Sequence, residues 1–334
     1  MAGYSAWVRL ADVNICFESD QERDICELKS FFKYHLTDFT DKADCVVVLK
    51  RQASFYMPKD AEMLWQTNRQ GITEPAGRIG RRRVSASAKG NTYSVATCYY
   101  SRAREEYYYG LMHDKTWICY RPAQHRIDYV LHQRPQRRSG PDYLETADPL
   151  SAIQLLIHVI TTFHARFLVH GAAVGIDGKA LLFLGKSGSG KSTLCTDLAR
   201  KKAAFMGDDI VLVYMKDSIP MLGALLFPAK LHLDNASEKT EVDVPAALQT
   251  DYCLSAPLAA VYSVQQSGQP TSTVEARTSA DLLQQLMEAS NGMMMQYDRQ
   301  QWLTTMYDIC ERMPYFLFHF GDRSTLNTSL LTLR

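Results

Sequence analysis

The strongest constraint on the fold is a glycine-rich segment that joins an apolar run to a helical pattern. Ala180–Leu184 reads as a buried strand, and Ser192–Lys202 reads as a helix. Between them lies Gly185–Ser192 (Gly-Lys-Ser-Gly-Ser-Gly-Lys-Ser), here named the glycine loop, which matches the P-loop (Walker A) pattern G-x-x-x-x-G-K-[ST]. A chance glycine–serine turn is the alternative, but the strand before it and the helix after it disfavour that reading. The segment therefore predicts an α/β domain with a phosphate-binding loop.

The residue types of the glycine loop suit a nucleotide. Glycines allow successive backbone N–H groups to turn inward around phosphates, and the following helix presents its positive end to the same anion. Lys191 is expected to reach the β- and γ-phosphates, and the Ser192 hydroxyl to ligate magnesium. The ligand predicted is ATP with Mg²⁺. The predicted nucleotide-binding residues are Gly185, Ser187, Gly188, Ser189, Gly190, Lys191, Ser192 and Thr193.

Two adjacent carboxylates follow the helix. A helix over Lys191–Ala203 rises roughly 18 Å at about 1.5 Å per residue. The short run Ala204–Gly207 returns about 13 Å at about 3.3 Å per residue, which brings Asp208 and Asp209 back toward the phosphates. Adjacent side chains on an extended chain point in different directions, so one carboxylate can face the metal and the other an acceptor. A solvated turn between two strands is the competing interpretation, because Gly-Asp-Asp is common turn composition.

A hairpin precedes the glycine loop. Ala172–Ile176 and Lys179–Leu184 flank Asp177-Gly178, a strong two-residue turn signal. In that register facing residue numbers sum to 355, so His170 is expected opposite Gly185, close to the phosphates. A lone histidine at the start of a strand is otherwise commonly structural.

The remaining chain suggests a second domain. Short β-like runs separated by polar segments predict a mostly antiparallel sheet with one helix, Cys26–Tyr34. The expected strands are Trp7–Leu10, Cys45–Leu49, Tyr93–Tyr100, Trp117–Arg121 and Ile127–His132. The polar, proline-broken stretch Gln133–Asp142 is a plausible linker, and helical periodicity resumes over Leu150–Phe167. We expect a β-rich domain over residues 1–147 and an α/β domain over 148–334. The tyrosines at 99, 100 and 107–109 could form a recognition surface or ordinary strand packing.

Composition narrows the class of protein. The 334 residues suggest about two domains, and 46% apolar with 22% charged residues is typical of a soluble globular chain. With 37 basic and 36 acidic residues there is no field to attract nucleic acid or a membrane. The eight cysteines form no Cys-x-x-Cys pair and are expected to be reduced thiols. The start of the chain has no signal-peptide pattern and no run approaches a spanning helix, so we expect a cytoplasmic protein.

Together these motifs resemble a known family. His170-Gly-Ala-Ala-Val, the hairpin, the glycine loop and Gly207-Asp208-Asp209 look like the kinase domain of HPr kinase/phosphorylase, whose P-loop core is similar to that of phosphoenolpyruvate carboxykinase. The resemblance implies that Asp208 lies on the metal side with Ser192, and that Asp209, assisted by His170, is the general base. Lys191 completes the implied catalytic set. The N-terminal region does not resemble the regulatory domain of that enzyme, and no segment resembles the one used for phosphorylase activity. The overall domain organisation is therefore closer to that of HPr-kinase-like kinases of lasso-peptide precursors.

The resemblance implies a phosphotransferase. The function expected is transfer of the γ-phosphoryl group of ATP to a serine hydroxyl of a peptide or small protein, such as the C-terminal serine of a lasso-peptide precursor. A serine hydroxyl is a poor nucleophile, so a carboxylate within hydrogen-bond reach is needed to take its proton. A small-molecule kinase acting on an amino acid or sugar hydroxyl, and a nucleotide-dependent regulatory protein, are the alternatives. The N-terminal domain is expected to help hold the acceptor, and a homo-oligomer is possible.

Overall fold

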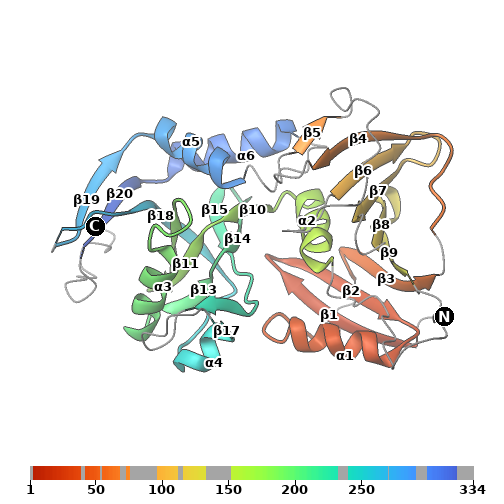
Figure 1. The fold of residues 1–334 in the computed structure, drawn as a ribbon, viewed down its shortest axis with the longest axis horizontal. Coiled ribbons are helices and arrows are strands. Elements are labelled where there is room, and N and C mark those ends of the chain that lie inside the picture. Colours follow the sequence, from red (N-terminus) through yellow and green to blue (C-terminus); the bar gives the residue numbers. More distant parts are fainter. Residues whose placement is uncertain are drawn as a thin grey trace, which may run out of the picture. The chain divides into compact units, whose positions relative to one another are not determined.

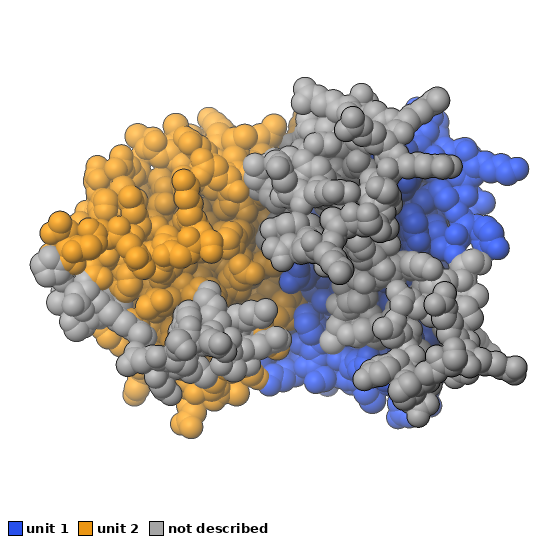
Figure 2. All heavy atoms as spheres, in the orientation of Figure 1, with its two compact units in different colours: residues 1–9, 13–160 blue, residues 10–12, 161–334 orange. Residues whose placement is uncertain are grey.

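The computed structural model describes residues 3–38, 42–52, 55–67, 73–75, 96–111, 116–132, 152–231, 240–269, 271–290 and 299–321. Contacts divide the chain into two compact units, residues 1–9 with 13–160 and residues 10–12 with 161–334 (Figure 2). The expected linker and the expected boundary at 147/148 both lie outside the described residues. No helix within the described ranges is long and apolar enough to span a bilayer. All eight cysteines are free thiols.

The first unit is built on one nine-stranded sheet with the order β1-β2-β3-β9-β8-β7-β6-β4-β5. Its described helix is α1 (Glu22–Phe31), with a short 3₁₀ turn at Pro122–Gln124. The strands are β1 (Tyr4–Leu10), β2 (Val13–Ser19), β3 (Cys45–Gln52), β4 (Ala61–Thr67), β5 (Thr73–Pro75), β6 (Ala96–Ser101), β7 (Glu106–Leu111), β8 (Thr116–Arg121) and β9 (Arg126–His132).

The predicted sheet of this unit is found, with additions. Strands β2, β4, β5 and β7 were not expected from the sequence, and the start of the predicted strand Tyr93–Tyr100 lies outside the described residues. The pairs β2–β3 and β3–β9 are parallel, whereas β9, β8, β7, β6, β4 and β5 pair antiparallel in turn. Tyr108 and Tyr109 are 3% and 0% exposed. Strand packing is therefore the role of these two tyrosines.

The second unit contains another nine-stranded sheet, in which seven strands follow the order β10-β14-β15-β18-β12-β11-β13, while β20 pairs with both β18 and β19 (Figure 1). The strands are β10 (Phe167–His170), β11 (Ala172–Ile176), β12 (Lys179–Leu184), β13 (Ala204–Gly207), β14 (Ile210–Lys216), β15 (Ile219–Gly223), β18 (Ser255–Gln266), β19 (Thr273–Arg277) and β20 (Tyr315–Phe320), with a separate pair β16 (Ala229–Leu231) and β17 (Thr240–Val242). The helices are α2 (Ile153–Phe163), which straddles the division between the units, α3 (Lys191–Arg200), α4 (Val244–Leu248), α5 (Ser279–Ser290) and α6 (Arg299–Arg312).

Three neighbouring parallel strands position the glycine loop. β12 pairs parallel with β18, and β18 pairs parallel with β20, so their carboxyl ends lie at one edge of the sheet. Ala180–Leu184 is buried throughout, as a strand covered on both faces should be. Helix α3 packs on β11 and β13 (Figure 1). Helix α5 packs on β10 and β12. The glycine loop thus leaves the sheet at the edge where ligands of α/β proteins usually bind.

The predicted hairpin is present, but it ends earlier than expected. Facing residues from Ala172↔Phe183 to Ile176↔Lys179 have the predicted register. The ladder does not continue to His170, which belongs to β10 and pairs with Ile210 of β14. The predicted helix through Phe167 is also too long. Helix α2 ends at Phe163 because Ala165 adopts a left-handed φ of 57°, and β10 begins immediately afterwards.

Candidate functional site

The glycine loop has the backbone conformation that its glycines were expected to permit. Gly185, Gly188 and Gly190 have φ angles of 135°, 81° and 103°, which L-amino acids with a side chain rarely adopt. A Cβ on Gly185 would lie 2.7 Å from the carbonyl oxygen of Val264. Gly190 immediately precedes α3, so the loop delivers the chain directly to a helix N-terminus. The resulting cradle fits an anion, which would accept hydrogen bonds from the backbone N–H groups and lie at the positive end of α3.

Lys191 points into the loop from the first residue of α3. Its side chain is buried, and Nζ donates hydrogen bonds to the carbonyl oxygens of Gly185 at 2.6 Å and Lys186 at 3.1 Å. A phosphate oxygen would accept a stronger, charge-assisted bond from this ammonium group than a carbonyl does. Ser189 Oγ is buried and has no hydrogen-bond partner within the structure. An unmet buried hydroxyl costs about 1–3 kcal/mol, and a bound oxygen ligand would remove that cost.

Ser192 and Asp208 lie together. Chain geometry predicted only that Asp208 and Asp209 return toward the loop, and the family resemblance implied that Asp208 is the one beside Ser192. Ser192 Oγ donates a hydrogen bond of 2.9 Å to Asp208 Oδ1. Burial raises the pKa of the half-buried Asp208 carboxyl, and the neighbouring Asp209 charge raises it further, against the lowering effects of Ser192 and Lys191. A cation bound here would favour the charged carboxylate.

These two oxygens form a small donor set for a metal. The described residues contain no group of three or more His, Cys, Asp or Glu side chains arranged to hold a metal ion. Mg²⁺ commonly takes only one or two protein ligands and completes its shell with water and substrate phosphates. The hydroxyl and carboxylate of Ser192 and Asp208 fit that pattern.

Asp209 faces a different partner. His170 Nε2 lies 3.1 Å from Asp209 Oδ1, and the Asp209 side chain is 75% exposed. Asp209 has a φ of 73°, a conformation that aspartate tolerates better than most residues. Its carbonyl oxygen accepts a hydrogen bond of 3.2 Å from the N–H of Gly171. The two adjacent carboxylates are therefore separated in direction, one toward Ser192 and one toward His170.

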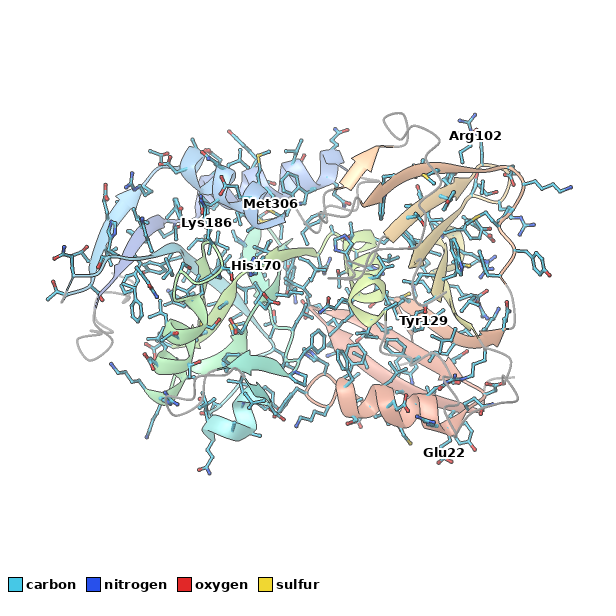
Figure 3. All side chains as sticks on the ribbon, viewed as in Figure 1. Glu22, Arg102, Tyr129, His170, Lys186 and Met306 are labelled. Carbon is cyan, nitrogen blue, oxygen red and sulfur yellow. The ribbon has the colours of Figure 1, made fainter. Side chains whose placement is uncertain are left out.

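A cavity of about 390 Å³ opens between the glycine loop and the helix α5. Its walls include His170 and Lys186, labelled in Figure 3, together with Ser189. The other lining residues are Gly185, Ser263, Val264, Gln265, Gln285, Glu288, Ala289 and Leu317. Of the predicted nucleotide-binding residues outside this cavity, Ser187 is exposed and Thr193 is half-buried on the first turn of α3.

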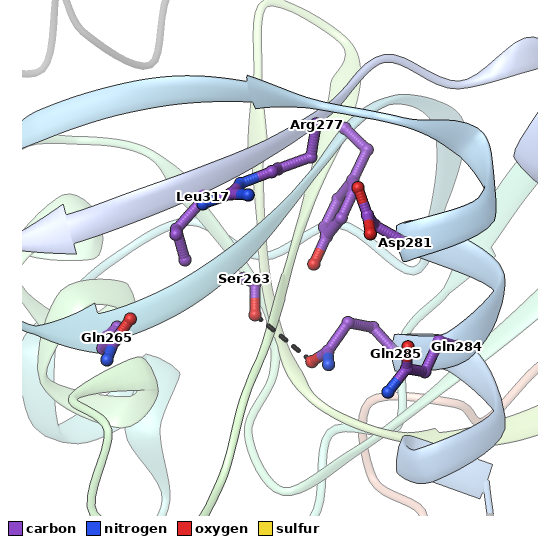
Figure 4. Close-up of a pocket in the computed structure, with 8 residues that line it drawn as sticks. Ser263, Gln265, Arg277, Asp281, Gln284, Gln285 and Leu317 are labelled. Atoms are coloured by element: carbon purple, nitrogen blue, oxygen red, sulfur yellow. Dashed lines mark hydrogen bonds between the residues drawn. The ribbon is translucent and has the colours of Figure 1, made fainter.

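A second cavity, of about 260 Å³, shares part of its wall with the first, and Figure 4 shows its lining residues. The two share Ser263, Gln265, Gln285 and Leu317. The second is completed by Arg277, Asp281, Gln284 and Tyr315. None of these wall residues, which come from β18, β19, β20 and α5, was expected from the sequence. The polar pattern of α5 resembles that of any solvated helix face, so no local signal separates a cavity wall from a surface.

Comparison with known proteins adds little to this geometry. No protein-family model matches the chain, and no curated protein matches it. Among solved structures, the Hpr(Ser) kinase/phosphatase from Coxiella burnetii is similar with 12% sequence identity, 47% of this chain and 87% of that chain covered, and a TM-score of 0.29. A likeness at this score carries no conclusion about fold or activity. The family resemblance, the P-loop character of the glycine loop and the roles of its residues stay predictions.

Proposed function

We propose that the second unit is an ATP-dependent kinase that transfers the γ-phosphoryl group to a serine hydroxyl of a peptide or small protein. The observation that carries the proposal is that the side chains of Asp208 and Asp209, beside the glycine loop, contact different partners. One carboxylate accepts a hydrogen bond from Ser192, and the other meets His170 at a cavity wall. A metal-side and an acceptor-side group are what phosphoryl transfer requires.

The residues around the loop suit ATP and Mg²⁺. The backbone of the glycine loop and Lys191 would hold the β- and γ-phosphates, and the unpaired hydroxyl of Ser189 would donate to one of them. Ser192 and Asp208 would hold the metal. Bound Mg²⁺ neutralises charge on the phosphate oxygens as the transfer proceeds.

The transfer moves one phosphoryl group to the acceptor and one proton to the protein. The acceptor hydroxyl oxygen forms a bond to the γ-phosphorus while the bond from that phosphorus to the β–γ bridging oxygen breaks, and ADP leaves. The hydroxyl proton passes to the Asp209 carboxylate. His170 lines the cavity and lies within hydrogen-bond distance of Asp209, so it would orient that carboxylate.

A second acceptor class is favoured by cavity size. A volume of about 390 Å³ lies within the usual range for small-molecule sites. An amino acid or sugar with a free hydroxyl would enter such a cavity and undergo the same chemistry. The alternatives differ only in the acceptor, so the test must present both kinds.

The test compares Asp209→Asn with wild type. Transfer from radiolabelled ATP is measured to serine-containing peptides, and in parallel to free amino acids and sugars. We expect Asp209→Asn to lower transfer by about 10²–10⁴-fold, because the amide cannot accept the proton, while ATP affinity changes little. Asp177→Asn is the matched control, since Asp177 is also exposed, has a positive φ of 50°, and lies in the hairpin turn. Full transfer by Asp209→Asn on an accepted substrate would refute the general-base role.

Nucleotide binding is tested separately. Lys191→Ala removes the ammonium group at the centre of the glycine loop. We expect a large loss of affinity for ATP in calorimetric titration. If Lys191→Ala bound ATP as tightly as wild type, the loop would not be the nucleotide site.

A further inference from the structure

One face of helix α5 turns a negative charge toward the proposed acceptor cavity. Gln285, Glu288 and Ala289 lie three and four residues apart, so they share one side of the helix. All three line the cavity that also contains His170 and Gly185. Glu288 supplies the one carboxylate among the residues lining this cavity.

The Glu288 carboxylate is held in place without being neutralised. Gln284 Nε2 donates to Glu288 Oε1 at 3.1 Å, and Gln285 Nε2 donates to Oε2 at 3.4 Å. Both donors are uncharged amides. Within the described ranges, no lysine, arginine or histidine nitrogen lies within 4.0 Å of Glu288. The carboxylate therefore has no ion-pair partner among the described residues, and Lys186 is the one lysine or arginine that lines the same cavity.

Gln285 ties this carboxylate to the sheet. Ser263 Oγ on β18 donates a hydrogen bond of 3.2 Å to Gln285 Oε1, the bond drawn in Figure 4. With Oε1 accepting from Ser263, the Gln285 amide directs its N–H groups to Glu288, so strand and helix together fix the position of the carboxylate.

The charge of Glu288 suits an acceptor better than a nucleotide. Phosphates in the glycine loop carry negative charge, and a carboxylate on the same cavity repels them. The cavity contains His170 and the loop residues Gly185, Lys186 and Ser189, but neither Ser192 nor Thr193 at the helix end. Glu288 therefore belongs to the part of the cavity that an acceptor occupies.

We propose that Glu288 selects acceptors that carry a positive charge close to the phosphorylated serine, such as a lysine or arginine within three residues of it. This inference rests on the proposed kinase function with a peptide acceptor. An exposed ion pair contributes modestly, so the expected preference is about two- to fivefold for each basic position that reaches Glu288. The preference should shrink at high ionic strength, because salt screens exposed charges.

The experiment uses the full chain and a peptide library. Each peptide has a central serine with three residues on either side, and one position at a time is fixed as Lys, Arg, Ala, Asp or Glu. Phosphate incorporation from radiolabelled ATP is measured at about 0.05 M and 0.5 M NaCl, conditions between which the Debye length changes several-fold. We expect wild type to prefer Lys or Arg, Glu288→Gln to lose the preference, and Glu288→Lys to prefer Asp or Glu. Glu311→Lys makes the same charge change at an exposed position of α6 that lines neither cavity, and should keep the wild-type preference.

The outcomes separate this inference from the proposed function. Transfer to the library with no basic preference in wild type, or with the same preference in wild type and Glu288→Lys, would overturn the role of Glu288 and leave the kinase intact. Loss of ATP affinity in Glu288→Gln would also overturn it, because it would place the side chain in the nucleotide site. ATP-dependent transfer to small molecules with none to any peptide would overturn the peptide acceptor, and this inference with it.

Discussion

Replacing Gly185 with alanine tests the close approach of the glycine loop to the sheet. Two costs add at this position. A φ of 135° is strained for any residue with a Cβ, which costs about 1–3 kcal/mol. The new Cβ would also lie 2.7 Å from Val264 O and 2.9 Å from Ser189 Oγ, and relieving such overpacking costs about 1–3 kcal/mol.

Gly188 provides the matched control within the same loop. It has a positive φ of 81°, but a Cβ there would meet no atom within 4 Å. Gly188→Ala therefore carries only the backbone cost, about 1–2 kcal/mol. Alanine restricts the unfolded chain by the same amount in both variants, about 0.4–1 kcal/mol, and that offset cancels in the comparison. We expect Gly185→Ala to be less stable than Gly188→Ala by about 1–3 kcal/mol.

The assay follows local opening of the sheet and nucleotide binding. Hydrogen–deuterium exchange over residues 180–184 measures the free energy that opens β12 and its neighbours. Gly178→Ala in the hairpin turn, with a φ of 74° and open space around it, should resemble Gly188→Ala in stability and keep wild-type ATP affinity. Gly188→Ala should lose ATP affinity, because its Cβ enters the phosphate cradle. Equal protection in Gly185→Ala and Gly188→Ala would refute the packing argument.

Two further predictions concern the polar groups of the loop. Ser189→Ala removes a buried hydroxyl that has no hydrogen-bond partner within the structure. The free energy of unfolding should therefore stay level or rise by up to about 1–3 kcal/mol, while ATP affinity falls. A loss of stability measured by urea unfolding would contradict this. Asp208→Asn should stabilise the protein at neutral pH, because burial raises the pKa of the folded-state carboxyl and so penalises its charged form. The gain should fade as pH falls from the raised folded-state pKa toward the ordinary value of 3.8, and should be absent below 3.8, where both folded and unfolded carboxyls are protonated. Thermal melts across pH, with and without Mg²⁺ and ATP, check this, since only wild type should gain from the metal.

Short-range rules predicted the elements that surround the loop. The Asp177-Gly178 turn and the alternation beside it set the hairpin register that the structure has. The length of the helix against the rise of the following strand predicted that Asp208 and Asp209 return toward the loop, and in the structure Asp208 accepts a hydrogen bond from Ser192. Each of these features depends on residues fewer than twenty positions apart, so chain geometry alone limits the possible arrangements.

The position of His170 was expected for the wrong reason. Extending the hairpin ladder placed it opposite Gly185, but β10 leaves that ladder and pairs with β14, with His170 facing Ile210. The N–H of Gly171 bonds to the carbonyl of Asp209 where the chain changes partner. A register argument follows one strand pair only and cannot weigh a competing partner from elsewhere in the chain. The histidine still reaches the site, because Ile210 directly follows Asp209.

The cavity walls lay beyond sequence reasoning. Gln285 and Glu288 are about a hundred residues from the glycine loop, and their spacing fits an ordinary amphipathic helix. Only the packing of α5 on β10 and β12 places them beside the loop. In the first unit, strands β4 and β7 were likewise missed, although β7 pairs with its immediate neighbours in the chain, β6 and β8.

The backbone conformation at Asp209 decides which substitution can test proton transfer without disturbing the fold. Asp208 is half-buried and bonded to Ser192, whereas Asp209 is exposed and reaches His170. The left-handed φ of 73° at Asp209 lies at the junction where β13 ends and β14 begins. Asparagine tolerates that conformation as well as aspartate does, so Asp209→Asn keeps the turn and removes only the charge. A β-branched residue at this position would lose both the turn conformation and the charge. The inactivity of such a variant would say nothing about proton transfer. The asparagine variant is therefore the substitution from which a general-base role can be inferred.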